Sequence, residues 1–170
     1  IGDAFATLKS ISQRHDTPIV VMCYSNLILR IGARTFISKC RTSNVAGLIV
    51  PDMIIEESTE LRVLCERNDI AFINLVTPVT PPARAELIAK SGSGFLYFVS
   101  VTGTTGMRAQ IDGSIAPRIR SLRKLTSLPI CVGFGISSPE LAAQAAEISD
   151  GVIIGSRVLQ LITQDDGSLE

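Results

Sequence analysis

The sequence predicts an α/β fold in which parallel strands alternate with helices, and three observations support this prediction. Short apolar runs such as PIVVMCY, GLIVP and GVIIG recur at roughly the 25–30-residue spacing of a βα unit. These runs are apolar throughout, as in strands that are covered on both faces. The segments VGFGISSPE (132–140) and DGVIIGS (150–156) both pass from such a run through glycine into a helix start. Two glycine turns of this kind on neighbouring strands form the phosphate site of a (β/α)₈ barrel.

The elements follow in a regular order along the chain. A first helix is expected to begin at Asp3, a capping residue type, with Phe5, Leu8 and Ile11 on one face. After it, the short apolar runs predict strands at 18–24, 45–50, 70–76, 94–100, 129–134 and 151–154. The segments between them predict helices at 33–42, 56–68, 82–91, 114–125, 139–148 and 157–162.

The number of βα units decides between related folds. A complete (β/α)₈ barrel takes about 250 residues, whereas this chain has 170 residues and six predicted strands. A flavodoxin-like or Rossmann sheet suits that number better, but in a Rossmann sheet the glycine turn follows the first strand. Here the glycine turns follow the last two strands. We therefore expect residues 1–170 to form a single, partial TIM-barrel domain, an incomplete (β/α)₈ barrel with about six βα units that lacks its N-terminal quarter.

Composition excludes several classes of function. Sixteen basic and sixteen acidic residues give a net charge of zero, which argues against nucleic acid or an anionic membrane as a partner. No apolar run approaches the ~20 residues that span a bilayer, and no signal peptide is visible. The four cysteines form no C-x-x-C pair, so we expect reduced thiols in a cytoplasmic protein. These cysteines are Cys23, Cys40, Cys65 and Cys131.

Several side chains at the predicted strand ends are candidates for binding, each with an ordinary structural alternative. Asp52 follows a strand and is able to hold a substrate N–H or a partner side chain, or to cap a helix or turn. The only tyrosines, Tyr24 and Tyr97, are expected to line an apolar pocket or simply to pack. Asn26 is a turn residue or an interface contact, and His15 is expected at the surface.

The stretch at 100–114 is long for a βα connection and rich in threonine and glycine. Such loops are often mobile lids over a site, in which Gly106 would offer an N–H and Arg108 a charge to a phosphate. The alternative is a plain surface loop. The sequence shows neither a nucleophile–base pair nor metal-ligand spacing, and no lysine is placed for a Schiff base. From the residues alone, we predict a phosphate half-site beside an apolar pocket.

Five segments resemble the α subunit of tryptophan synthase, in order and with compatible spacing. They are MCYSNLILRIG, GLIVPDMIIEES, FLYFVSVTGTTGMR, PICVGFGISSPE and DGVIIGS. The resemblance implies a (β/α)₈ barrel lyase of tryptophan biosynthesis that cleaves indole-3-glycerol phosphate to indole and glyceraldehyde 3-phosphate. It also implies a β subunit partner in an α₂β₂ complex, with pyridoxal phosphate in that partner and no cofactor here.

The resemblance assigns roles to residues of this chain. The phosphate would be held by Gly106, Gly135, Gly155 and Ser156. The indole ring would be flanked by Tyr24, Ile49, Leu75, Tyr97 and Phe134, with Thr105 in the closing loop. Asn26 and Asp52 would face the β subunit.

The departures from the family pattern are equally informative. The family's catalytic glutamate and aspartate both precede the point that corresponds to Ile1, and the last helix also has no counterpart. No catalytic residue is therefore assigned, and we expect this chain alone to be inactive. Two alternatives remain open. One is a non-catalytic protein that activates a β subunit, and the other is a different phosphate-binding barrel such as indole-glycerol-phosphate synthase, which would normally show a strand-end lysine.

Overall fold

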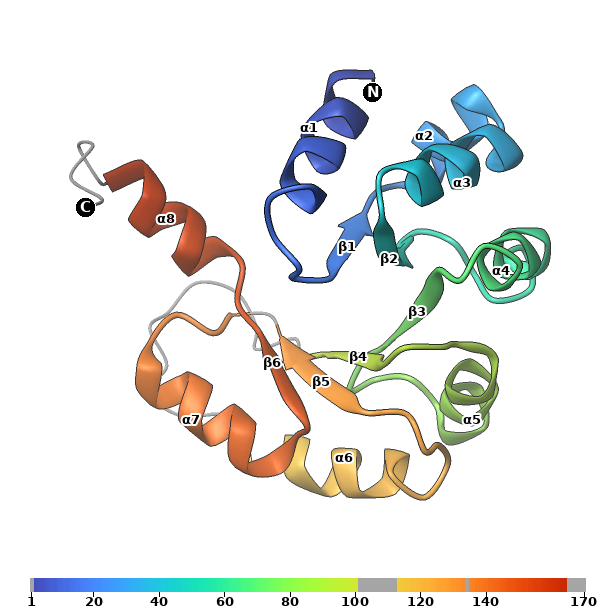
Figure 1. Cartoon of the computed structure of the whole chain (residues 1–170). Helices are drawn as coiled ribbons and strands as arrows, with labels where there is room; N and C mark the ends of the chain where they lie inside the picture. Colours follow the sequence, from blue (N-terminus) through green and yellow to red (C-terminus); the bar gives the residue numbers. More distant parts are fainter. Residues whose placement is uncertain (1, 101–112, 134, 165–170) are drawn as a thin grey trace. The chain divides into compact units, whose positions relative to one another are not determined.

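The computed structural model describes residues 2–100, 113–133 and 135–164 (Figure 1). Contacts divide the chain into two compact units, the first made of Ile1–Asn74 with Ser91–Gly94 and the second of Leu75–Lys90 with Phe95–Glu170. Helices and strands alternate in both units. The strands are β1 (Ile19–Met22), β2 (Val45–Ile49), β3 (Ala71–Val76), β4 (Leu96–Val99), β5 (Ile130–Gly133) and β6 (Gly151–Ile153). The helices are α1 (Gly2–Ser12), α2 (Ser25–Ile31), α3 (Ala33–Thr42), α4 (Thr59–Glu66), α5 (Pro82–Ser91), α6 (Ile115–Leu122), α7 (Pro139–Ile148) and α8 (Ser156–Gln164).

In the first unit, β1, β2 and the part of β3 up to Asn74 are parallel and lie in chain order. Gly47 at the centre of β2 permits close contact between its neighbours, because a Cβ there would lie 2.8 Å from Cδ1 of Ile73 and 3.3 Å from Cγ2 of Val20. Helices α1, α3 and α4 supply much of the apolar core of this unit. The rings of Phe5 and Phe36 meet edge to face in that core, with centroids 5.5 Å apart.

In the second unit, β4, β5 and β6 are also parallel and in chain order, with Val99 opposite Gly133 and Gly133 opposite Ile153. Helices α5, α6 and α7 contribute to its core together with apolar strand residues. Leu96 and Phe98 of β4 belong to that core. Because successive side chains of a strand point to opposite faces, Tyr97 faces away from it.

Most predicted elements are confirmed, and three predicted helices, 33–42, 82–91 and 139–148, match the observed bounds. The predicted strands all exist, but each is shorter than predicted by one or two residues at one end or at both ends. The prediction of a helix over 56–68 was wrong at its start, because the chain first makes a turn that buries Ile55 and Ser58, and α4 begins at Thr59. Helix α2 was not predicted at all.

Other expectations are tested by the same part of the chain. All four cysteines are free thiols, and His15 is exposed. None of the helices within residues 2–100, 113–133 and 135–164 has the length and apolar character needed to cross a bilayer. The proposed lid at 101–112 lies outside the described residues.

Candidate functional site

Two backbone turns follow neighbouring strands in the second unit. Gly135 lies just after β5 with φ +78°, a conformation that side chains other than glycine rarely adopt. Helix α7 begins four residues later, where the hydroxyl of Ser138 accepts the N–H of Leu141 at 3.3 Å. The cap satisfies one of the N–H groups that a helix start leaves without an intrahelical partner.

The second turn links β6 to α8. The carbonyl of Gly155 accepts the N–H of Leu159 at 3.2 Å, which makes Gly155 the residue at the cap of α8, and Ser156 the first residue of the helix. A Cβ on Gly155 would meet nothing within 4 Å, so the space beside its backbone is open. The N–H groups of a first helical turn attract anions. Since β5 and β6 are paired, the two turns follow adjacent strands.

Tyr97 lies on the face of β4 opposite the helix-side core and packs on Gly133. A Cβ on Gly133 would come within 2.8 Å of the tyrosine Oη and 2.9 Å of its Cε2. Both the N–H and the hydroxyl of Ser100 donate to the Gly133 carbonyl, each at 3.0 Å. Tyr97 is 7% exposed, and burial raises its pKa, so its ring stays a neutral phenol at pH 7. Leu75 is half-buried. Its neighbour Val76 belongs to the helix-side core, so Leu75 points to the other face of the strand.

The first unit holds the other predicted residues. Ile49 ends β2 and is 5% exposed, whereas the Tyr24 side chain is 63% exposed just before α2. Asn26 is exposed in the first turn of α2.

Asp52 ties two strand ends together within the first unit. Its Oδ1 accepts the N–H of Ser25 at 2.9 Å and its Oδ2 accepts the Ser25 hydroxyl at 2.7 Å. The Ser25 hydroxyl and N–H hold the pKa of this carboxyl below its ordinary value. Of the roles predicted for Asp52, a cap or turn contact is therefore present, although the helix that it caps is α2 and not the helix that follows it. The predicted contact with a partner stays a prediction.

The described residues bring together part of the predicted site. The second unit contains Gly135, Gly155, Ser156, Leu75 and Tyr97, and the first contains Tyr24, Ile49, Asn26 and Asp52. Thr105, Gly106, Arg108 and Phe134 lie outside the described residues. Within the part of the chain that is described, no three His, Cys, Asp or Glu side chains form a group that could hold a metal ion.

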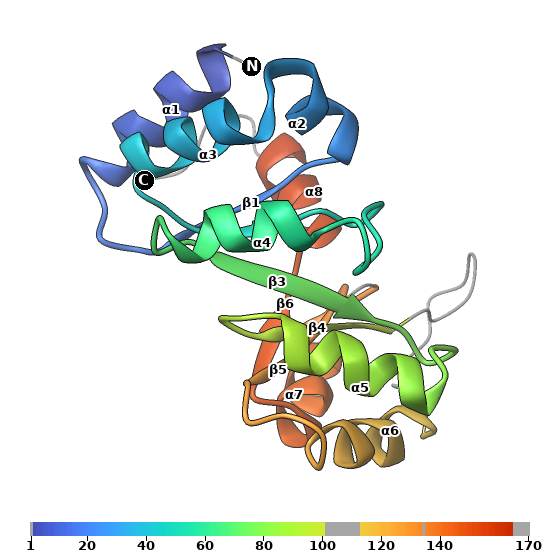
Figure 2. The ribbon, with the colours of Figure 1, turned by 90° about the vertical axis from the view of Figure 1, so that its right-hand side faces the viewer.

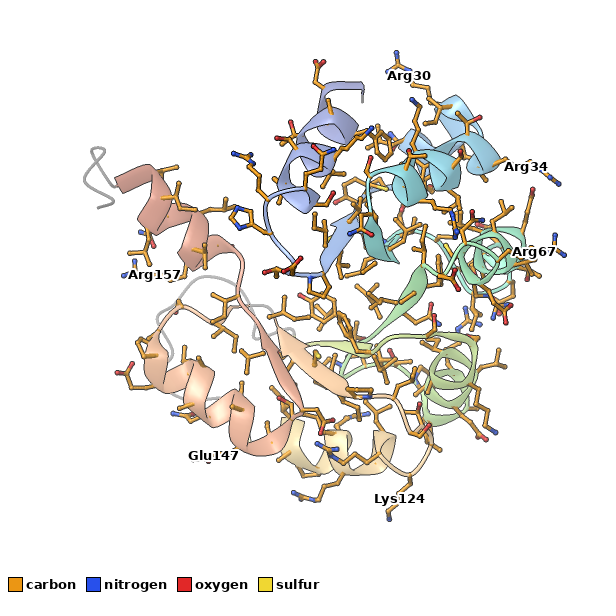
Figure 3. All side chains as sticks on the ribbon, viewed as in Figure 1. Arg30, Arg34, Arg67, Lys124, Glu147 and Arg157 are labelled. Carbon is orange, nitrogen blue, oxygen red and sulfur yellow. The ribbon has the colours of Figure 1, made fainter. Side chains whose placement is uncertain are left out.

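Three contributors were missed by the sequence analysis: Ser25, Ser100 and Gly133. All three stand inside motifs that had been singled out, YSN, SVTG and GFG, but their partners are too distant in the chain to be inferred from spacing. The charged side chains labelled in Figure 3 project outward from the ribbon, among them Arg157 of α8, whose Nη1 donates to Oε1 of Gln160 at 3.0 Å. The described polar groups at the two turns are backbone N–H groups and serine hydroxyls, those of Ser137 and Ser138 before α7 and that of Ser156 at the start of α8.

Comparisons with known proteins agree with this geometry. The family model described as "Tryptophan synthase alpha chain" matches residues 1–170. The tryptophan synthase alpha chain of Rhodopirellula baltica is 43% identical over 145 residues, covering 85% of this chain and 52% of that protein. The corresponding protein of Lactiplantibacillus plantarum is 40% identical over 158 residues, covering 93% and 60%. The chain thus spans little more than half the length of these relatives.

Solved structures are similar over nearly the whole chain. Tryptophan synthase subunit alpha from Campylobacter jejuni matches with a TM-score of 0.86 and 33% identity, over 98% of this chain and 66% of that one. An alpha subunit from Pyrococcus furiosus matches with a TM-score of 0.84 and 31% identity, over 96% and 66%. The similarity confirms the predicted fold class, with six strands of a (β/α)₈ barrel present in this chain.

Proposed function

The chain belongs to the tryptophan synthase alpha chain family, and we propose that it contributes to the lyase reaction that cleaves indole-3-glycerol phosphate to indole and glyceraldehyde 3-phosphate. The observation that carries the proposal is the pair of turns at Gly135 and Gly155–Ser156 on adjacent strands. Their N–H groups suit a phosphate, because a helix start carries a partial positive charge and unpaired donors.

The proposed division of labour assigns binding to the residues of this chain. Ser156 donates its N–H and hydroxyl to the phosphate, and the N–H groups of Gly135 and Gly155 complete the described part of the anchor. Tyr97 and Leu75 of the second unit give an apolar surface for the indole ring, and the contacts with the ring that the resemblance assigns to Ile49 and Tyr24 stay predictions. We further propose that Gly106 helps to hold the phosphate, that Phe134 contacts the indole ring and that Thr105 belongs to the closing loop. An anchored phosphate fixes the glycerol chain and so orients the ring for reaction.

Proton transfer is assigned to no residue of this chain. Cleavage needs an acid or base to shift the indole tautomer and protonate its C3, with a carboxylate to stabilise the cation. The resemblance assigns neither of the family's two catalytic carboxylates to a residue within 1–170. The proposal therefore attributes substrate binding, not proton transfer, to the residues described above.

We also propose that the protein docks on a tryptophan synthase β subunit in an α₂β₂ complex, with pyridoxal phosphate held by that partner only, and that it acts in the cytoplasm. The proposed docking residues are Asn26, which is exposed beside the Ser25–Asp52 contact, and Asp52 itself. Burial raises the pKa of Cys40 and of Cys65 to about 12, and such inert thiols suit a reducing compartment.

A second candidate is a non-catalytic activator of a β subunit. Indole release from indole-3-glycerol phosphate, measured beside the stimulation of an added β subunit, separates the two functions. Because this chain alone is expected to be inactive, the assay uses a protein extended to the length of the relatives: indole release supports the lyase, and stimulation of the β subunit without indole release supports the activator.

The phosphate anchor is tested by calorimetry with glycerol 3-phosphate. Ser156→Ala removes one hydrogen bond to a charged group, worth about 1.5–3 kcal/mol, so affinity is expected to fall about tenfold or more. Gly135→Val is expected to abolish binding because its side chain enters the anion's path. Thr163→Ala serves as the control on the same helix, since that hydroxyl donates to carbonyls of α8 itself. Unchanged affinity in both Ser156→Ala and Gly135→Val would refute the anchor.

A further inference from the structure

The second unit contains a cleft that the proposed function does not use. It has a volume of about 300 Å³ and lies between α5 and α6, helices that are neighbours in Figure 2. The strand residues Val76 and Phe98 form its floor. Its walls are Thr77, Thr80, Pro82, Ala85, Pro117, Arg118, Ser121, Leu122 and Leu125.

This cleft is on the opposite side of the strands from the proposed phosphate and indole site. Phe98 belongs to the helix-side core, whereas its neighbour Tyr97 packs over Gly133 on the other face. The alternation of side chains along β4 separates the two places. A ligand in the cleft would therefore not occupy the site assigned above.

The polar groups of the cleft are suited to an anion. Oγ1 of Thr80 accepts the N–H of Thr77 at 3.0 Å, and the two threonine hydroxyls share one hydrogen bond at 3.1 Å. That bond uses only one of the two hydroxyl hydrogens, so in the described structure the other is free to donate. The Ser121 hydroxyl donates to the carbonyl of Pro117 at 3.1 Å. Arg118 adds a guanidinium that has no ionic partner among the described residues.

The rest of the lining suits an apolar body. Pro82 and Pro117 are exposed and Leu125 is half-buried, so these three side chains offer apolar surface to a ligand, whereas Phe98 and Val76 beneath them are at most 2% exposed. A volume of about 300 Å³ is at the small end of ligand pockets, about twice a cavity that holds benzene. A single aromatic ring with a short acidic arm matches both the volume and the donors.

We propose that the cleft between α5 and α6 binds a small aromatic carboxylate. The ring lies against Pro82, Pro117 and Leu125, and the carboxylate accepts from Arg118 and from the free hydroxyl of the Thr77–Thr80 pair. Arginine is the side chain best shaped for carboxylates, since its N–H groups match the two oxygens. The site depends on neither the phosphate anchor nor the lyase reaction.

The test uses phenylacetate as the probe and 2-phenylethanol as its uncharged counterpart, followed by NMR titration of the whole chain. We expect shifts in the amide signals of α5 and α6, with phenylacetate bound more tightly than the alcohol. Arg118→Gln is expected to weaken phenylacetate about fivefold to tenfold and to leave the alcohol unchanged. Arg120→Gln on the same helix, which does not line the cleft, is the matched control and should bind as the unmodified chain does.

A second variant blocks the cleft without touching the core. Ser121 is an exposed lining residue, so Ser121→Phe is expected to fold and to abolish binding of both probes. Equal affinity of phenylacetate in Arg118→Gln, Arg120→Gln and Ser121→Phe would overturn the proposal. Loss of the probe in Gly135→Val but not in Ser121→Phe would also overturn it, because the probe would then occupy the other face.

Discussion

Replacing Gly133 with alanine is expected to destabilise the second unit. The new Cβ would lie 2.8 Å from Cβ of Ile153 and 2.8 Å from Oη of Tyr97, closer than real Cβ contacts. Cβ of Ile153 is attached to the backbone and has no rotamer that moves it away, while Tyr97 is only 7% exposed. Strand β5 or β6 must therefore shift. Inserting a methyl group into such a site costs about 1–3 kcal/mol of unfolding free energy.

The measurement is urea denaturation of the purified chain, followed by far-UV circular dichroism. A second background, Tyr97→Phe, removes the hydroxyl oxygen, so Gly133→Ala should cost less there than in the unmodified chain. Relief should be incomplete, since Cε2 of the ring would still lie 2.9 Å away and Ile153 is unchanged. Gly113→Ala is the control, because a Cβ there meets nothing within 4 Å.

Two results would refute this reasoning about Gly133. One is a Gly133→Ala variant whose stability lies within about 0.5 kcal/mol of the unmodified chain, the range of neutral surface changes. The other is an equal cost in the presence and absence of the Tyr97 hydroxyl, which would show that this hydroxyl does not crowd the new Cβ.

Three further predictions concern other parts of the chain. Oδ2 of Asp150 accepts the buried N–H of Ile130 at 2.8 Å, so Asp150→Ala leaves that N–H without a partner and should lower the unfolding free energy by about 1–3 kcal/mol in urea denaturation. Asp150→Asn keeps an acceptor and should cost less. Equal costs of the two substitutions would contradict this explanation. The hydroxyl and N–H of Ser25 lower the pKa of Asp52, so the ionised carboxylate stabilises the fold above the unfolded pKa of about 3.9, and this stabilisation is lost as pH falls through the lower folded value. The melting temperature should therefore fall less steeply with decreasing pH in Asp52→Asn than in the unmodified chain. The same dependence on pH in both chains would count against the contact. Leu159 of α8 is 65% exposed, so we expect the chain to self-associate in sedimentation and Leu159→Lys to reduce that association without changing the melting temperature; equal association of the two chains would contradict this.

The sequence predicts the alternation of elements well because each strand is a short apolar run with helix signals after it. The helix at 139–148 is marked by Ser138, a side chain that does cap α7, with proline following it. Helix α2 was missed because only seven residues form it, between a strand end and Gly32, whose φ of +83° separates it from α3. A segment that short carries too little periodicity to distinguish a helix from a loop.

Part of the candidate site could be predicted from the sequence, and part could not. Glycines at strand ends could be placed from their position in the sequence, since a strand followed by glycine and a helix start has few geometries. The Ser25–Asp52 contact could not, because 27 residues separate its partners and only the pairing of β1 with β2 brings them together. The Glu56–Glu57 segment was misassigned to a helix because burial of Ile55 in a turn overrides its local helix propensity.

The central claim is that the turns after β5 and β6 anchor a phosphate in a tryptophan synthase alpha chain site. A crystal structure of the chain with glycerol 3-phosphate at saturating concentration tests it most directly. The account predicts the phosphate between Gly135 and the start of α8, accepting the N–H and hydroxyl of Ser156. Glycerol 3-phosphate bound elsewhere, with these two turns unchanged and empty at saturation, would contradict it.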